Sequence, residues 1–177
     1  MKKNIISLLL LITFTSCVVQ LIRGNDFENL SDSNRKRIKK LDTFDNLNTE
    51  FIYEVTGKQL IEELKMKKKA IVYLFANGCT SDNCIPLSNI VRYADTNDYE
   101  LYLVMISYYK LKETLLQQFE SQLFSVNVDY YGEEKSRKYM EAFKNELAYK
   151  EFTKGEYLGG YIFFQQGEIV DVKMNLQ

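Results

Sequence analysis

The chain has 177 residues, with 23 lysines and arginines against 24 acidic residues, and it contains no histidine. So balanced a charge gives no reason to expect a nucleic acid or an acidic surface as a partner. The lack of histidine excludes Ser-His-Asp and Cys-His catalysis and removes the commonest metal ligand. The length suits one domain with a substantial core, which the abundant tyrosine and phenylalanine can fill.

The first residues have the layout of a secretory signal peptide. Lys2 and Lys3 precede an apolar run from Ile5 to Phe14, and small polar residues come after it. The run is too short to cross a bilayer, which needs about 20 apolar residues. The residues Phe14-Thr15-Ser16-Cys17 resemble the lipobox of bacterial lipoproteins, in which a peptidase cuts before a cysteine that already carries a diacyl group.

This resemblance implies that residues 1–16 are a lipoprotein signal peptide and that Cys17 is the lipid attachment site, carrying acyl groups such as palmitate. The protein would then be anchored to a membrane of the bacterial cell envelope and face outside the cytoplasm. Phe14 stands where the lipobox usually has Leu, and Val18 and Val19 extend the apolar run. An uncleaved membrane anchor and ordinary secretion therefore remain alternatives.

Residues 17–48 are polar, mixed in charge and without a sustained apolar period. We expect a solvated tether here, with at most one helical turn near Arg37–Leu41, rather than an interaction motif. The globular domain is expected to span residues 49–177.

The first half of this domain predicts alternating strands and helices. Thr56 and Gln59 have the spacing of a capping box, and apolar residues on one helical face come after them. Ala70–Ala76 is apolar throughout, as in a strand that is buried on both faces. The expected elements are a strand at Glu50–Val55, a helix after Thr56, a strand at Ala70–Ala76, a helix at about Pro86–Ala94 and a strand at Leu101–Ser107.

The second half predicts two amphipathic helices and a hairpin. One apolar stripe consists of Leu111, Leu115, Phe119 and Leu123, and a second of Met140, Phe143 and Leu147. Tyr161–Phe164 and Ile169–Met174 flank a turn, and Val170, Val172 and Met174 alternate with polar residues as in a half-buried strand. The element order predicts an α/β fold with a parallel centre and an antiparallel hairpin at its edge.

The segments AIVYLFANGCTSDNC, LYLVMIS and GYIFFQQGEIVDVKM, in this order and with a helix after the first, resemble a thioredoxin-like domain. The resemblance implies a central mixed sheet flanked by helices, here with a helical insertion before the C-terminal hairpin. It implies that Cys79 is the attacking thiolate at a helix N-terminus and that Cys84 resolves the mixed disulfide. The thiols of exported proteins would be the partners, and no cofactor is required.

Three positions differ from the usual pattern of this family. Four residues separate Cys79 from Cys84, where active members have two. Gly159 stands at the position of the expected cis-proline, so Gly159 and Gly160 are the candidate substrate-binding residues. Tyr73 stands where thioredoxins have a buried acidic group, and a tyrosine is not an equivalent base.

Three functions remain open on the sequence alone. The protein is a membrane-tethered thiol–disulfide oxidoreductase, or Cys79 and Cys84 form a structural disulfide in a non-catalytic binding module. Metal binding is the third and weakest alternative, because a closed site normally needs four ligands and the chain has no histidine and no second cysteine pair. The insertion, including Tyr130 and Tyr131, is expected to pack on the sheet; a partner-binding surface is its alternative.

Overall fold

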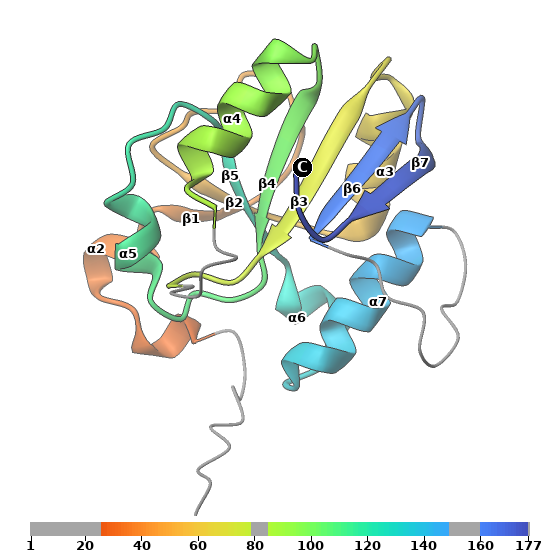
Figure 1. Cartoon of the computed structure of the whole chain (residues 1–177). Coiled ribbons are helices and arrows are strands. Elements are labelled where there is room, and N and C mark those ends of the chain that lie inside the picture. Colours follow the sequence, from red (N-terminus) through yellow and green to blue (C-terminus); the bar gives the residue numbers. More distant parts are fainter. Residues whose placement is uncertain (1–25, 79–84, 149–159, 177) are drawn as a thin grey trace, which may run out of the picture.

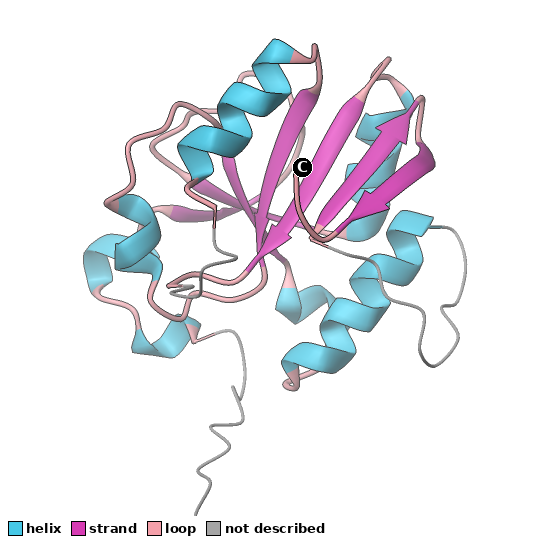
Figure 2. Cartoon of the chain, in the orientation of Figure 1, coloured by secondary structure: helices cyan, strands magenta, loops and turns pink. Residues whose placement is uncertain are grey.

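The computed structural model describes residues 26–78, 85–148 and 160–176, which fold into an α/β domain around one mixed sheet (Figures 1 and 2). The strands are β1 (Ile38–Lys40), β2 (Ile52–Val55), β3 (Ala70–Phe75), β4 (Glu100–Met105), β5 (Leu123–Val126), β6 (Tyr161–Gln165) and β7 (Glu168–Lys173). The helices are η1 (Phe27–Asn29), α2 (Asp32–Arg35), α3 (Gly57–Lys65), α4 (Leu87–Thr96), α5 (Leu111–Leu115), α6 (Val128–Tyr131) and α7 (Ser136–Ala148). None of the helices in these ranges is long and apolar enough to cross a membrane.

The strand order is β1-β2-β5-β4-β3-β6-β7. The first five strands in this order run parallel to one another, and β6 and β7 run antiparallel to their neighbours. This arrangement confirms the predicted parallel centre with an antiparallel hairpin at the edge. It also explains the unbroken apolar sequence of β3, since a strand between β4 and β6 is covered on both faces.

Side chains of β3 alternate between two apolar layers. Val72 and Leu74 belong to the layer under α3 and α7, whereas Ile71 and Phe75 belong to the layer under α4 and α5. The chain moves across the sheet in one direction from β2 to β3 and in the opposite direction from β3 through β4 to β5. Because the crossovers are right-handed, the helix before β3 and the helix after it lie on opposite faces of the sheet. Figure 1 shows α4 in front of the sheet and α3 behind it.

The start of α3 forms as the sequence predicts. The Thr56 hydroxyl accepts from the Gln59 N–H, and the Gln59 side chain accepts from the Thr56 N–H, which completes the capping box. At the next residue, a side chain on Gly57 would place its Cβ 2.4 Å from the Phe143 carbonyl oxygen. Glycine here lets α7 pack closely on α3, which confirms that the insertion covers the sheet.

The predicted helix through Leu111 and Leu123 is wrong in its second half. Helix α5 ends at Leu115, and Leu123 instead begins β5, which is inserted between β2 and β4. The four-residue apolar spacing suits a helix, but Leu123–Val126 is buried at every position as a strand. The Gln122 amide donates to the Phe51 carbonyl at 2.7 Å and joins this segment to the entry of β2. The insertion is therefore not purely helical.

Residues 26–48 differ from the predicted tether, because they pack on the domain. β1 pairs in parallel with β2, and Leu41, only 5% exposed, donates its N–H to the Glu54 carbonyl. Phe44 packs edge-on against Tyr102 and lies beside Phe124. The apolar residues of this segment follow neither a helix period nor a strand period. Their spacing is set by the strands on which they pack, and these strands come later in the chain.

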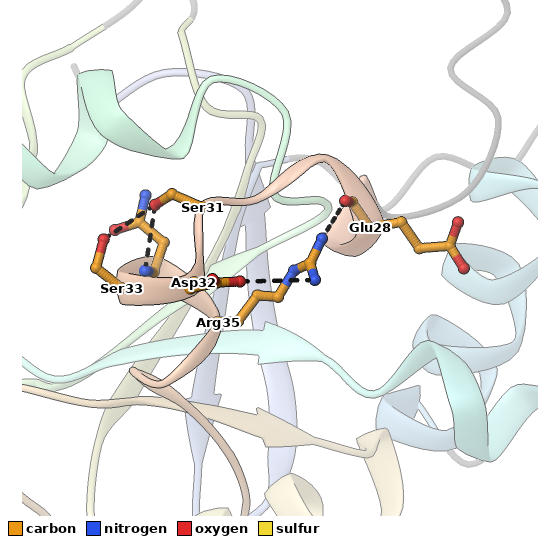
Figure 3. A network of polar contacts seen from close by, with 6 residues as sticks. Glu28, Ser31, Asp32, Ser33 and Arg35 are labelled. Atoms are coloured by element: carbon orange, nitrogen blue, oxygen red, sulfur yellow. Dashed lines mark hydrogen bonds and ion pairs between the residues drawn. The ribbon is translucent and has the colours of Figure 1, made fainter.

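A small polar network holds the first two turns of this segment together. The Arg35 guanidinium donates to the Glu28 carbonyl and pairs with the Asp32 carboxylate, as Figure 3 shows. Ser31 caps α2 by accepting from the Asn34 N–H. Local polar contacts therefore order a stretch whose composition resembles that of a linker.

The hairpin is confirmed, but one face of β7 differs from the prediction. Phe163 lies opposite Asp171 and Phe164 lies opposite Ile169, so Val170 is the extra residue of a β-bulge. Val170 is 56% exposed, whereas Ile169 and Val172 pack against the core. A bulge shifts the alternation by one residue, which sequence periodicity does not reveal.

A buried carboxyl group lies on the sheet among polar partners. Glu54 accepts a hydrogen bond from the Tyr108 hydroxyl at 3.0 Å, and this hydroxyl is 2.6 Å from Ser125 Oγ. Burial raises the pKa of Glu54, and the charge of Asp129 acts in the same direction. The hydrogen bond from Tyr108 and the charge of Lys40 oppose this shift.

Replacing Glu54 by Gln is expected to stabilise the domain more at pH 7 than at pH 4. Folding raises the pKa of Glu54, so the folded protein binds this proton more tightly than the unfolded chain does. Proton binding therefore stabilises the fold at low pH, and this stabilisation is lost as the pH rises through the pKa that Glu54 has in the folded protein. Glu54→Gln should therefore raise the free energy of unfolding by roughly 0.5–2 kcal/mol at pH 7. Urea unfolding at both pH values measures this, with exposed Glu50→Gln as the control. An equal gain at both pH values would contradict the burial effect.

Candidate functional site

The carboxyl end of β3 and the start of α4 enclose a cavity of about 310 Å³. Gly78, three residues after β3, and Ile85, two residues before α4, both line it. In the sequence, the predicted Cys79 and Cys84 come between these two positions. Both cysteines lie outside the described residues, and so do the predicted Cys17 and Gly159. The cavity walls also include Tyr73, Phe75, Ala76, Pro86, Leu87, Glu113, Thr114 and Gln117.

Asn77 fixes the chain at the end of β3. Its amide nitrogen donates to the Ser107 carbonyl at 2.7 Å, and its amide oxygen accepts from the Thr114 hydroxyl at 2.5 Å. All three residues are buried, so each polar group finds its partner inside the protein. This contact joins the ends of β3 and β4 to α5 and holds the residue two positions before Cys79.

Gly78 makes the closest packing around the cavity. Its φ is +65°, and a Cβ there would lie 2.3 Å from Lys110 Cδ and 2.8 Å from Glu113 Oε2. Only glycine combines this conformation with this space. Lys110 Nζ and Glu113 Oε1 are 3.3 Å apart, so a cation and a carboxylate lie together beside the residue that precedes Cys79.

The N-terminus of α4 faces the same cavity. The Leu87 N–H donates to Gln117 Oε1 at 3.0 Å, which satisfies one of the free donors at the helix end. The first turn of α4 carries no acidic residue. The positive end of the helix dipole is therefore not neutralised from within the helix.

Stacked aromatic rings form the wall next to the hairpin. The Tyr73 ring stacks on Phe75 at 5.4 Å and on Tyr161 at 4.4 Å between ring centroids. The Gly160 carbonyl accepts from the Leu74 N–H, and a Cβ on Gly160 would lie 3.3 Å from the Tyr73 ring. The structure thus brings the predicted Gly160 against a side chain that lines the cavity.

Tyr73 has no basic character at neutral pH. Burial raises the pKa of its hydroxyl above the ordinary value of a tyrosine, against an opposing hydrogen bond with Tyr161. The hydroxyl therefore stays protonated and serves as a packing and hydrogen-bonding group.

A larger groove of about 880 Å³ lies on the opposite layer, along α3. Its walls come from residues 41–45, from α3 and from Tyr130, which is 55% exposed. Lys65 pairs with Glu62 on this helix, and Lys67, two residues beyond its end, pairs with Glu63. Within the described part of the chain, no group of three or more acidic or cysteine side chains is arranged to hold a metal ion.

Comparison of the chain with protein-family models, with curated proteins and with solved structures finds no match. Function must therefore be inferred from the residues themselves.

Sequence reasoning missed most of the cavity wall. Thr114 and Gln117 fall between the apolar positions of the predicted helix, and Lys110 and Glu113 resemble ordinary surface charges. One signal was available in the sequence. Thr114 is next to Leu115 of the apolar stripe, and a polar side chain that is buried beside such a stripe needs a hydrogen-bond partner. The identity of that partner, Asn77, depends on how β3 and α5 meet.

Removing the Asn77 side chain is expected to lower the free energy of unfolding by about 2 kcal/mol, because the Ser107 carbonyl and the Thr114 hydroxyl lose their partner in a buried place. Urea unfolding of Asn77→Ala measures this. Asn89→Ala is the matched control, since Asn89 is exposed on α4 and should change little. If both variants lost the same free energy of unfolding, the buried hydrogen bonds of Asn77 would contribute nothing to stability beyond the effect of an exposed asparagine.

Proposed function

We propose that this protein is a thioredoxin-like oxidoreductase that exchanges disulfides with exported proteins through Cys79 and Cys84. The observation that carries the proposal is that Gly78 and Ile85 line the same cavity. In the sequence, Gly78 directly precedes Cys79 and Ile85 directly follows Cys84. The described residues on either side of the two cysteines therefore meet at one cavity beside the start of α4.

The arrangement of the elements supports this proposal. β3 lies inside the sheet between β4 and β6, α3 and α4 cover opposite faces, and the antiparallel hairpin pairs with β3 on the side away from β4. Gly160 enters β6 beside Tyr73, at the edge of the cavity. These features match the element order that the resemblance implies.

The proposed chemistry needs only the two thiols and a substrate disulfide. The Cys79 thiolate attacks one sulfur of that disulfide, which forms a mixed disulfide and releases the other substrate sulfur as a thiolate. The Cys84 thiolate then attacks Cys79 Sγ, which releases the reduced substrate and leaves the Cys79–Cys84 disulfide. The reverse sequence oxidises a substrate dithiol. α4 begins at Leu87, three residues after Cys84 in the sequence, and its dipole would favour the thiolate form of a cysteine near its N-terminus.

A trapping experiment tests this function. In Cys84→Ser the mixed disulfide cannot be resolved, so envelope proteins should accumulate as adducts that dithiothreitol releases. Cys79→Ser is the matched control and should trap no adduct, because it lacks the attacking sulfur. The reduction potential of the wild-type pair should also fall in the range of oxidoreductases, above roughly −300 mV.

A pair that resists reduction until the domain unfolds, together with no adduct in either variant, would contradict catalysis. Cys79 and Cys84 would then form a structural disulfide in a non-catalytic binding module.

We also propose that Cys17 carries the lipid that anchors this domain to a membrane of the bacterial cell envelope, outside the cytoplasm. Support comes from the lipobox-like residues before Cys17 and from the packing of the chain from Asp26 onward on the domain. Two or three acyl chains hold a protein firmly, because each buried methylene contributes about 0.8 kcal/mol.

Lipidation is tested by growing bacteria that express the full chain with an alkyne analogue of palmitate. The wild type should incorporate the label and appear in the membrane fraction. Cys17→Ser should lose the label and keep its signal peptide, which intact mass measurement detects. Cys79→Ser should keep the label, and a label on Cys17→Ser would contradict the assignment.

A further inference from the structure

Five cationic side chains lie close together in sequence at one edge of the domain. They are Arg35, Lys36, Arg37, Lys39 and Lys40, and all are exposed. The whole chain has a net charge of −1, so this segment differs from the rest of the protein. The predicted tether would have dispersed these charges in solvent, whereas the structure places them at the end of α2, in the link that follows it and on β1.

Two of the five cations lie within 4.0 Å of a carboxylate oxygen. Arg35 pairs with Asp32 within the network of Figure 3, and Lys40 lies 3.7 Å from Asp129. Lys36, Arg37 and Lys39 make no ion pair among the described residues. Lys39 Nζ lies 3.3 Å from the centre of the Phe51 ring, so one side of this ammonium group already makes a cation–π contact.

β1 is the last strand at this end of the sheet, where cations commonly prevent edge-to-edge aggregation. That role accounts for Lys39, but Lys36 and Arg37 precede the strand and do not protect its edge. The segment therefore carries more positive charge than edge protection requires.

The position of the segment along the chain points to one partner. Asp26 lies nine residues after the proposed lipid site Cys17. Nine residues span at most about 32 Å and on average roughly 17 Å. If the lipid anchor holds, the domain cannot leave the neighbourhood of the bilayer, and an exposed cationic segment meets the headgroups at high effective concentration.

We propose that Lys36, Arg37 and Lys39 bind anionic phospholipid headgroups of the membrane that holds the lipid at Cys17. The inference rests on the lipid anchor proposed above. The domain then docks with its β1 edge toward the bilayer. Each cation near an anionic surface favours docking by about fivefold, so three cations suffice to bias the orientation of a tethered domain.

Amide hydrogen exchange of the full-length lipidated protein in nanodiscs tests this docking. The discs contain phosphatidylcholine alone or with about 30% phosphatidylglycerol, and about 0.5 M salt screens the charges. Exchange within residues 33–40 should slow by about tenfold in the anionic discs only, and salt should reverse the slowing. Lys36→Gln/Arg37→Gln/Lys39→Gln should abolish it.

The matched control is Lys65→Gln/Lys68→Gln/Lys69→Gln, which removes the same charge near the end of α3 and should keep the protection. Equal loss in both variants, or equal protection in neutral discs, would overturn the proposal. Failure of the lipid anchor is distinguishable, because an unlipidated protein would not be retained in either disc.

Discussion

The burial of β3 on both faces is the constraint on which the rest of the structure depends. An apolar strand of six residues must be covered above and below, and the two crossover directions supply α3 with α7 on one face and α4 with α5 on the other. The same burial makes β3 a rigid support. The residues after its carboxyl end, Ala76 to Gly78, therefore start at a defined place beside α4.

Polar contacts then determine the cavity at that end. Asn77 satisfies the Ser107 carbonyl and the Thr114 hydroxyl, and Gln117 occupies one donor of α4. Leaving the buried groups among these unpaired would be costly, so the contacts hold this part of the cavity wall in place. These contacts fix Gly78 and the start of α4, which are the described parts of the chain on either side of the two cysteines.

The N-terminal segment links this site to the proposed anchor. Because residues 26–48 pack on the domain, the proposed lipid at Cys17 would be joined to the domain by only the residues between 17 and 26. Four strand-to-strand steps lead from β1 to β3, and at about 4.8 Å per step β3 lies roughly 19 Å from the β1 edge. Docking through Lys36, Arg37 and Lys39 would place the thiols at a fixed height above the membrane.

The sequence by itself determined the α/β class, the capping box at Thr56 and the hairpin, because each depends on residues close together in the chain and on one regular period. The lipobox-like residues before Cys17 can also be read from the sequence alone. Only the tertiary structure decided that Leu123 begins a strand, that β1 joins the sheet and that Asn77 meets Thr114. In each of these cases, local preference was weak or pointed elsewhere. Contacts between residues tens of positions apart prevailed because they bury apolar side chains and pair polar groups that no neighbour in the chain can reach.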